Sequence, residues 1–381
     1  MLWKGRKRGN CGWSFLNGVS EIMMIDERIS RPGERKPSRI REVDLLRGVA
    51  IILMITGHSF IVHPINIQDV SWCAALRHWI YTFHMELFFL LAGCVYHCSD
   101  YRKYIGKKID RLAVPYLFFG LIALLLHSAG LEVVNRQTTF GAGLVKLLTQ
   151  GGNYWFLYAL FVLYLIYPLI DKVCRKPWME YALAVGLVAM ISFMALPGLF
   201  ELRNVVYYTP YFVLGRYSIR LLQPKIERSH CANIGLFVIS LVIYIGMDRL
   251  FEIYPNVILI RYIRAVAMML VLYVPVYYLL RAVDYGWAPA KQTERFLNNC
   301  SRYSLQLYLF NGFVLVIVRT LVVSILGIHN PFVIVSSVVL GNLLVTLLVC
   351  IYLLPKTKWL AWLCGIGKRP WKKDNPAVNA A

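Results

Sequence analysis

Several patterns that often reveal a function are absent from this sequence. The nine cysteines form no CxxC pair and no zinc-binding spacing, and only Cys73 falls in a segment expected outside, so no disulfide framework is indicated. Cys94, His97 and Cys98 supply three soft ligands without a fourth, and we expect no metal there. Internal repeats, the usual mark of secondary transporters, are missing. No segment is long enough for a soluble nucleic-acid-binding module, so the net charge of +21 needs another explanation.

The sequence does contain long apolar runs. Hydrophobic residues make up 58% of the 381 positions and the mean hydropathy is +0.56, which is too apolar for one soluble core. Inside lipid each run must be helical, because its backbone groups have no water to bind. The predicted fold class is therefore all-α, a polytopic membrane helix bundle of about ten transmembrane helices. The expected spans are residues 43–62, 80–97, 112–129, 154–170, 179–197, 205–222, 232–250, 258–280, 303–325 and 332–354.

Basic residues predict the orientation of this bundle. Cytoplasmic loops collect Lys and Arg, and with both termini cytosolic, 32 of the 41 basic residues face the cytosol. The chain then divides into a basic tail (1–42), a membrane domain (43–354) and a second basic tail (355–381). The positive charge reflects topology and attraction to anionic membrane lipids, and no nucleic-acid partner is expected. Arg47 lies inside the first span. The other eight basic residues are expected on the outer side: Arg77, Arg136, Lys146, Arg203, Arg249, Arg261, Arg264 and Arg319.

A cation and an imidazole lie inside the first span. Arg47 and His58 are eleven positions apart, so on a helix they share about the same face and lie about 16 Å apart along its axis. Ionisable side chains are costly in lipid and usually persist where they act. The alternative is that Arg47 reaches a lipid headgroup and that His58 is an ordinary core histidine.

The second span contains a carboxylate, Glu86. This span runs inward and the first runs outward, so Glu86 and His58 are expected at similar depth. A carboxylate that accepts a hydrogen bond from one imidazole nitrogen orients the ring and leaves the other nitrogen free to take a proton from a hydroxyl. We therefore predict His58 as a general base and Glu86 as its orienting group; the alternative places Glu86 in water at the outer interface.

Two cations mark the cytosolic start of the third span. Lys108 and Arg111 are three residues apart, so they share a helix face and could clamp phosphate groups. An ordinary basic flank is the alternative.

Taken together, these segments resemble the acyltransferase-3 family of integral membrane acyltransferases, which modify sugars and other surface molecules. The Arg-x10-His spacing of Arg47 and His58 after Asp44 is similar to the family's first-helix signature, and Glu86 to Gly93 resembles its acidic-Leu-Phe-Phe-x-x-Ser-Gly segment. The similarity covers about residues 40–355. Further similar segments are Lys108-Ile-Asp-Arg111 with Pro115, the Trp155-Phe-Leu helix, Tyr211-Phe-Val-Leu-Gly215, and Ser304-Leu-Gln-Leu-Tyr308-Leu-Phe-Asn311.

Three departures from the family pattern concern the substrates more than the reaction. Lys108 stands where an arginine is usual, which replaces a bidentate phosphate grip by a point charge. Ala92 replaces a serine, which removes a hydroxyl. Asn311 replaces a late histidine, so no second proton carrier is expected there.

The resemblance implies transfer of an acyl group, most often acetyl, to a hydroxyl of a saccharide that faces outward or is carried on lipid. Acyl-CoA is then the donor substrate, with no permanently bound cofactor, and its phosphates would meet Lys108, Arg111 and Arg47. His58, with Glu86 and Arg47 in the catalytic group, would deprotonate the acceptor or carry the acyl group first. Both routes stay open. The expected setting is a bacterial inner membrane.

A polar stripe on the ninth span is predicted to line the acceptor passage. Ser304, Tyr308 and Asn311 are four and three residues apart, although such stripes also serve helix packing. Trp155 and Asp44 complete the predicted substrate-binding set.

Two other classes of function remain open. A secondary transporter would use Arg47, His58 and Glu86 as a proton or substrate relay without covalent chemistry. In a non-catalytic assembly or sensor protein, the same polar residues would only pack the bundle.

Overall fold

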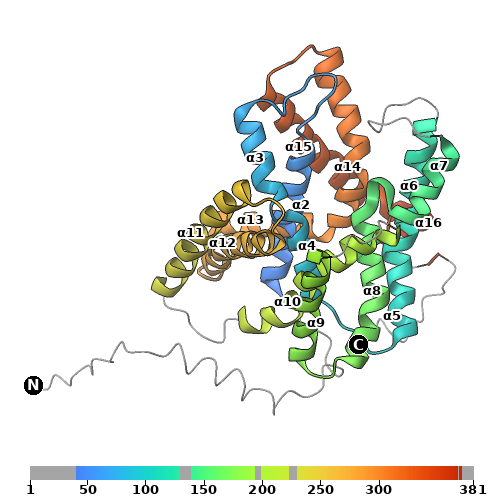
Figure 1. Ribbon diagram of the computed structural model, residues 1–381. Helices are drawn as coiled ribbons and strands as arrows, with labels where there is room; N and C mark the ends of the chain where they lie inside the picture. Colours follow the sequence, from blue (N-terminus) through green and yellow to red (C-terminus); the bar gives the residue numbers. More distant parts are fainter. Residues whose placement is uncertain (1–39, 129–138, 194–198, 223–229, 368, 371–381) are drawn as a thin grey trace, which may run out of the picture.

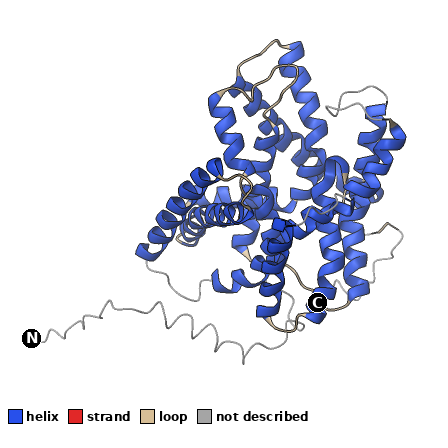
Figure 2. Cartoon of the chain, in the orientation of Figure 1, coloured by secondary structure: helices blue, strands red, loops and turns tan. Residues whose placement is uncertain are grey.

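The computed structural model of the chain describes residues 40–128, 139–193, 199–222, 230–367 and 369–370. Within these ranges all regular secondary structure is helical (Figure 2), which confirms the predicted all-α class. The predicted N-terminal tail lies almost entirely outside the described residues. The α-helices are α2 (Arg41–His58), α3 (Ser71–Tyr81), α4 (His84–Cys94), α5 (Tyr101–Lys108), α6 (Val114–Ser128), α7 (Phe140–Gln150), α8 (Trp155–Val173), α9 (Pro177–Phe193), α10 (Leu202–Leu222), α11 (His230–Ile253), α12 (Ile258–Asp284), α13 (Ala288–Arg302), α14 (Ser304–Arg319), α15 (Pro331–Leu348) and α16 (Lys358–Leu363).

Each of the ten predicted spans overlaps a helix. Among the described residues, six helices, counted with the turns that continue them, are long and apolar enough to cross a membrane. The other four predicted spans correspond to α2, α4, α9 and α10, so the total of ten and the cytosolic placement of the termini remain predictions. The six spanning helices are Tyr101–Ser128, Phe140–Val173, His230–Ile253, Ile258–Asp284, Ser304–Ile325 and Pro331–Lys356.

Helix α2 lies at the centre of the bundle, with α4, α13, α14 and α15 around it (Figure 1). Gly48 permits the closest of these approaches, because a Cβ atom there would lie 2.3 Å from the carbonyl oxygen of Leu297 in α13. Helix α13 lies between the predicted spans 258–280 and 303–325, where the sequence predicts a cytosolic loop. That expectation missed its apolar face, which buries Ala290, Leu297 and Cys300.

Helices α4 and α10 pack with their backbones in contact. A Cβ atom at Gly93 would lie 2.0 Å from the carbonyl oxygen of Phe212, and one at Gly215 would lie 1.9 Å from that of Leu90. Each glycine therefore lets its helix approach the backbone of the other, since any side chain at either position would push the helices apart. This contact fixes how α4 is rotated and where its polar residues point.

Candidate active site

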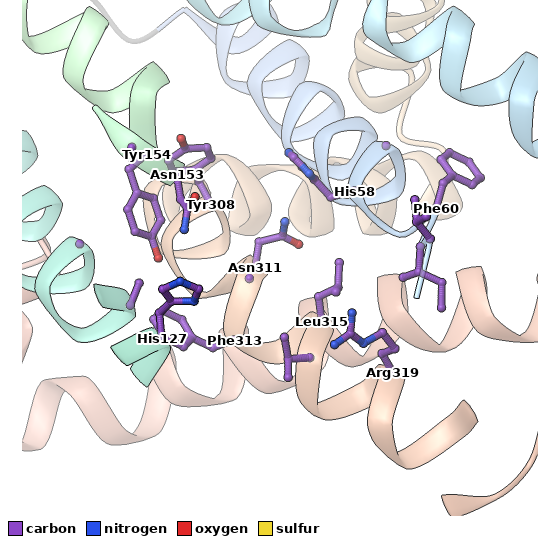
Figure 3. Close-up of a pocket in the computed structure, with 18 of the residues that line it drawn as sticks. His58, Phe60, His127, Asn153, Tyr154, Tyr308, Asn311, Phe313, Leu315 and Arg319 are labelled. Carbon is purple, nitrogen blue, oxygen red and sulfur yellow. The ribbon is translucent and has the colours of Figure 1, made fainter. Parts of the chain in front are cut away.

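His58 is the last residue of α2, and its side chain projects into a cavity of about 690 Å³ between α2, α6, α7 and α14 (Figure 3). The backbone amide of Ser59 still donates to the carbonyl oxygens of Ile55 and Thr56, at 3.0 and 3.1 Å, and the chain leaves the helical path at Phe60. His58 is exposed and lines this first cavity. A reactant that enters the cavity can reach the imidazole.

Tyr308 and Asn311 line the first cavity from α14, as predicted for an acceptor passage (Figure 3). Asn342 of α15 holds Asn311 by donating to its side-chain oxygen at 2.7 Å, and Thr346 donates to the Asn342 oxygen at 3.3 Å. With its oxygen engaged, Asn311 can offer its amide N–H groups to the cavity. Ser304 is not among the described residues that line this cavity, because it begins α14 at the far end of the helix.

Four further basic residues in the first cavity were not predicted as site residues. His127, in the last turn of α6, lies across the cavity from His58 in Figure 3. Arg77, Lys146 and Arg319 line the same cavity from α3, α7 and α14. The sequence carried a signal for His127, because it is an ionisable residue inside the predicted span 112–129.

Glu86 lines a second cavity of about 770 Å³ instead of the first. Its carboxylate forms a hydrogen bond with Tyr207 of α10 and lies within electrostatic range of Arg261 and Arg264 of α12. The predicted hydrogen bond between Glu86 and His58 is therefore wrong: close packing of α4 on α10 turns Glu86 toward Tyr207. The two cavities adjoin, and both are lined by Tyr81, Lys146 and Gly152.

The three cations predicted to bind the donor do come together. Lys108 ends α5 and lies within electrostatic range of both Arg47 and Arg111. Its Nζ lies 3.4 Å from the ring centroid of Tyr164 and 5.2 Å from that of Tyr104. Aromatic faces attract a cation without neutralising it, so the ammonium stays available to an anion. We call Arg47, Lys108 and Arg111 the cation cluster; none of the three lines either cavity.

The backbone changes form at the cation cluster. Residues Ile109–Ala113 form a π-helical turn, η2, between α5 and α6. Such turns insert an extra residue into a helix and are frequent at functional sites. Here the turn separates Lys108 from the membrane helix α6 and contains Arg111.

The C-terminal segment packs against this turn. Arg369 Nε donates to both carboxylate oxygens of Asp110, at 2.8 and 2.9 Å, and Trp362 Nε1 donates to Asp110 at 3.3 Å. Gln306 of α14 donates to the backbone carbonyl oxygen of Cys364 at 2.6 Å. The tail predicted at 355–381 therefore begins as a docked segment; residues 368 and 371–381 lie outside the described residues.

The remaining predicted substrate residues lie elsewhere in the site. Trp155 lines the second cavity and stacks on Tyr208, with ring centroids 5.9 Å apart. Asp44 pairs with Arg47, with an Oδ1 to NH1 distance of 3.5 Å, one turn away on α2. Asp44 therefore belongs with the cation cluster, and Trp155 with Glu86.

Comparison with known proteins identifies the family of the chain. The acyltransferase-3 family model, described as an acyltransferase domain, matches residues 40–354. Nodulation protein NolL of Sinorhizobium fredii is 27% identical over 179 residues, which cover 45% of this chain and 46% of that protein. Nodulation protein NolL of Mesorhizobium japonicum is 26% identical over 178 residues, with coverage of 45% and 46%. The chain thus matches about half the length of these curated relatives, and no solved structure matches it. Because the family match takes in nearly all of the described helices, the chain belongs to the acyltransferase-3 family of membrane acyltransferases.

Proposed function

We propose that this integral membrane protein transfers an acyl group, acetyl in the simplest case, from acyl-CoA at the cytosolic side to a hydroxyl of a cell-surface or exported saccharide. His58 acts as the catalytic base. The observation that carries the proposal is the placement of two sites along one helix. In the N-terminal half of α2, Arg47 lies within electrostatic range of Lys108, which is near Arg111. At the C-terminal end of α2, His58 lies open in a polar cavity.

The cation cluster suits the donor. Coenzyme A carries its negative charge on phosphate groups, and Arg and Lys bind phosphate through charge-assisted hydrogen bonds. Three cations that lie together repel one another unless an anion sits among them, and only Asp44 pairs with one of the three in the described residues. We therefore place the phosphates at Arg47, Lys108 and Arg111.

The acyl group must then travel along α2 to His58, a rise of about 16 Å for eleven residues. The intervening part of α2 is apolar: Ile51, Met54 and Ile55 form a buried cluster on which Phe88 and Tyr308 pack. A thin, flexible thioester arm can pass here only if rings such as Phe88 and Tyr308 move aside. Passage of the donor arm thus requires a local opening between α2, α4 and α14.

In the first cavity, the acceptor hydroxyl gives its proton to a nitrogen of His58 as its oxygen attacks the thioester carbonyl carbon. The C–S bond then breaks, and the thiolate of coenzyme A takes the proton back from the imidazolium. In this proposal the amide N–H of Asn311, which lines the same cavity, stabilises the oxyanion of the tetrahedral intermediate. An alternative route uses His58 itself as the first nucleophile, which gives an acyl-imidazole that the hydroxyl then attacks.

Transfer of label tests the proposal directly. Purified protein in lipid nanodiscs is incubated with acetyl-CoA labelled in the acetyl group and with oligosaccharides from exported polysaccharides. We expect labelled glycan from the wild type and from His63→Gln, an exposed histidine that lines neither described cavity, and a loss of at least about 100-fold in His58→Gln. If His58→Gln turned over as fast as the wild type, His58 would not be the catalytic base. In sealed vesicles that contain the same protein, uptake of either substrate without acyl transfer would support a transporter instead.

A further inference from the structure

The basic residues expected on the outer side are concentrated in the two cavities. Outer loops generally contain few Lys and Arg, because the positive residues of membrane proteins gather in the cytosol. Arg249 pairs with Glu252 at 3.2 Å on the surface, and Arg136 lies outside the described residues. The other six of the eight line the first cavity, the second or both: Arg77, Lys146, Arg203, Arg261, Arg264 and Arg319.

The two cavities differ in how their positive charge is balanced. The second contains the carboxylates of Glu86 and Glu201, and its Arg264 is paired with Asp248 at 2.8 Å. The first contains Arg77, Lys146 and Arg319, and no Asp or Glu is found among the described residues that line it. The excess positive charge is therefore greatest around His58.

Within the described part of the chain, none of the three cations of the first cavity forms an ion pair with a carboxylate. Arg77 has an aromatic partner instead: its guanidinium carbon lies 5.2 Å from the ring centroid of Tyr81. Cations in a partly enclosed cavity attract anions more strongly than they would in open water, because the surrounding protein lowers the effective dielectric constant. Lys146 also lies within electrostatic range of Glu201 in the second cavity. Most of the unbalanced positive charge that can bind an anion in the first cavity therefore comes from Arg77 and Arg319.

We infer that the acceptor carries an anionic group, a carboxylate or a phosphate, which Arg77, Lys146 and Arg319 bind while a neighbouring hydroxyl faces His58. This inference rests on the proposed function and specifies its substrate class. The anion-binding residues come from α3, α7 and α14, so they surround the cavity in which Tyr308 and Asn311 lie. Lys146 also lines the second cavity, where further sugar units of a longer acceptor could stack on Trp155.

Binding measured without acyl-CoA tests the inference separately from the reaction. Protein in nanodiscs of zwitterionic lipid is titrated calorimetrically with a glucuronate-containing oligosaccharide and with its carboxyl-reduced, neutral form. A second pair is N-acetylglucosamine 1-phosphate and N-acetylglucosamine. We expect the acidic member of at least one pair to bind about tenfold tighter or more, as for a charge-assisted contact. Equal binding within both pairs would overturn the inference.

Matched variants identify the residues responsible. Arg319→Gln and Lys146→Gln should reduce the preference for the acidic saccharide to about threefold or less while leaving acyl-CoA binding unchanged. Arg249→Gln removes an outer arginine away from the cavities and should leave the preference intact. If Arg249→Gln weakened acidic binding as much as Arg319→Gln, general surface attraction would explain the result and the site would be refuted.

Three further outcomes separate the possible explanations. If adding anionic phospholipid to the nanodiscs abolished the preference, a lipid headgroup would be the occupant and the inference would fail. Acidic binding that depends on Arg319 but is never followed by acyl transfer would support the site and refute the proposed function. Equal acyl transfer to acidic and neutral saccharides, with no effect of Arg319→Gln, would support the proposed function and refute the anion-binding site.

Discussion

Asp110 and Arg369 are far apart in the sequence but form a two-oxygen ion pair, with Arg369 Nε at 2.8 and 2.9 Å from the two carboxylate oxygens. The pair lies beside the cation cluster, because Asp110 is between Lys108 and Arg111 in the chain. Arg369 therefore neutralises the one carboxylate that would otherwise oppose donor phosphates at this turn.

A comparison of single and double variants tests whether Arg369 acts by neutralising Asp110. Arg369→Gln should raise the KM for acyl-CoA about threefold with kcat nearly unchanged, because both partners are partly exposed and such pairs contribute only about 0.5–1 kcal/mol. Asp110→Asn in the same chain should restore the KM, since no carboxylate is then left to repel phosphate. If the double variant were as weak as Arg369→Gln alone, the C-terminal segment would act only by packing.

The second prediction concerns Lys108 and its aromatic neighbours. Lys108→Gln should raise the KM for acyl-CoA by about tenfold, because one charge-assisted phosphate contact is lost. Lys108→Arg keeps the charge and should stay within a few-fold of the wild type. Lys107→Gln, which removes an exposed neighbour, is the matched control, and an equal effect there would indicate general surface charge. Initial rates over a range of acyl-CoA concentrations measure all three.

The third prediction concerns the proposed oxyanion donor. Asn311→Ala should lower kcat by about 100-fold with a smaller change in KM, since the lost contact strengthens only in the transition state. Asn342→Ala removes the side chain that orients Asn311 and should lower kcat less. A change confined to KM in both variants would place Asn311 in substrate binding alone.

The fourth prediction concerns the contact between α4 and α10. Gly215→Ala should destabilise the protein by about 1–3 kcal/mol, because the added methyl group would overlap the backbone of Leu90. Gly246→Ala is the control: that residue lies in α11 with nothing within 4 Å of an added Cβ, and the exchange should be neutral or slightly stabilising. Thermal unfolding in detergent compares the two, and a similar loss in both variants would contradict the role of Gly215.

The sequence predicted well the features that depend on local pattern. Each predicted span overlaps a helix, because apolar runs determine the helices and can be read along the chain. Lys108 lies within electrostatic range of Arg47, and Tyr308 and Asn311 share the cavity of His58. These groupings join different helices, and the resemblance to a known family indicated them.

Features that depend on contacts between distant segments could not be predicted in this way. The direction of Glu86 follows from how Gly93 and Gly215 let two helices approach, which no local pattern states. The docking of Arg369 on Asp110 and the entry of His127 into the cavity likewise join elements remote in the sequence. The sequence predicts a loop where α13 lies for the same reason: the apolar face of α13 is recognisable as buried only once α2 is beside it.

The central claim is that His58 joins a donor on one side of the membrane to an acceptor on the other. Protein reconstituted in sealed vesicles, with labelled acetyl-CoA enclosed and saccharide outside, tests it most directly. We predict that label reaches the external saccharide with the wild type and His63→Gln, and that His58→Gln gives none above background while its unfolding temperature is unchanged. Transfer by His58→Gln at the wild-type rate would contradict the mechanism.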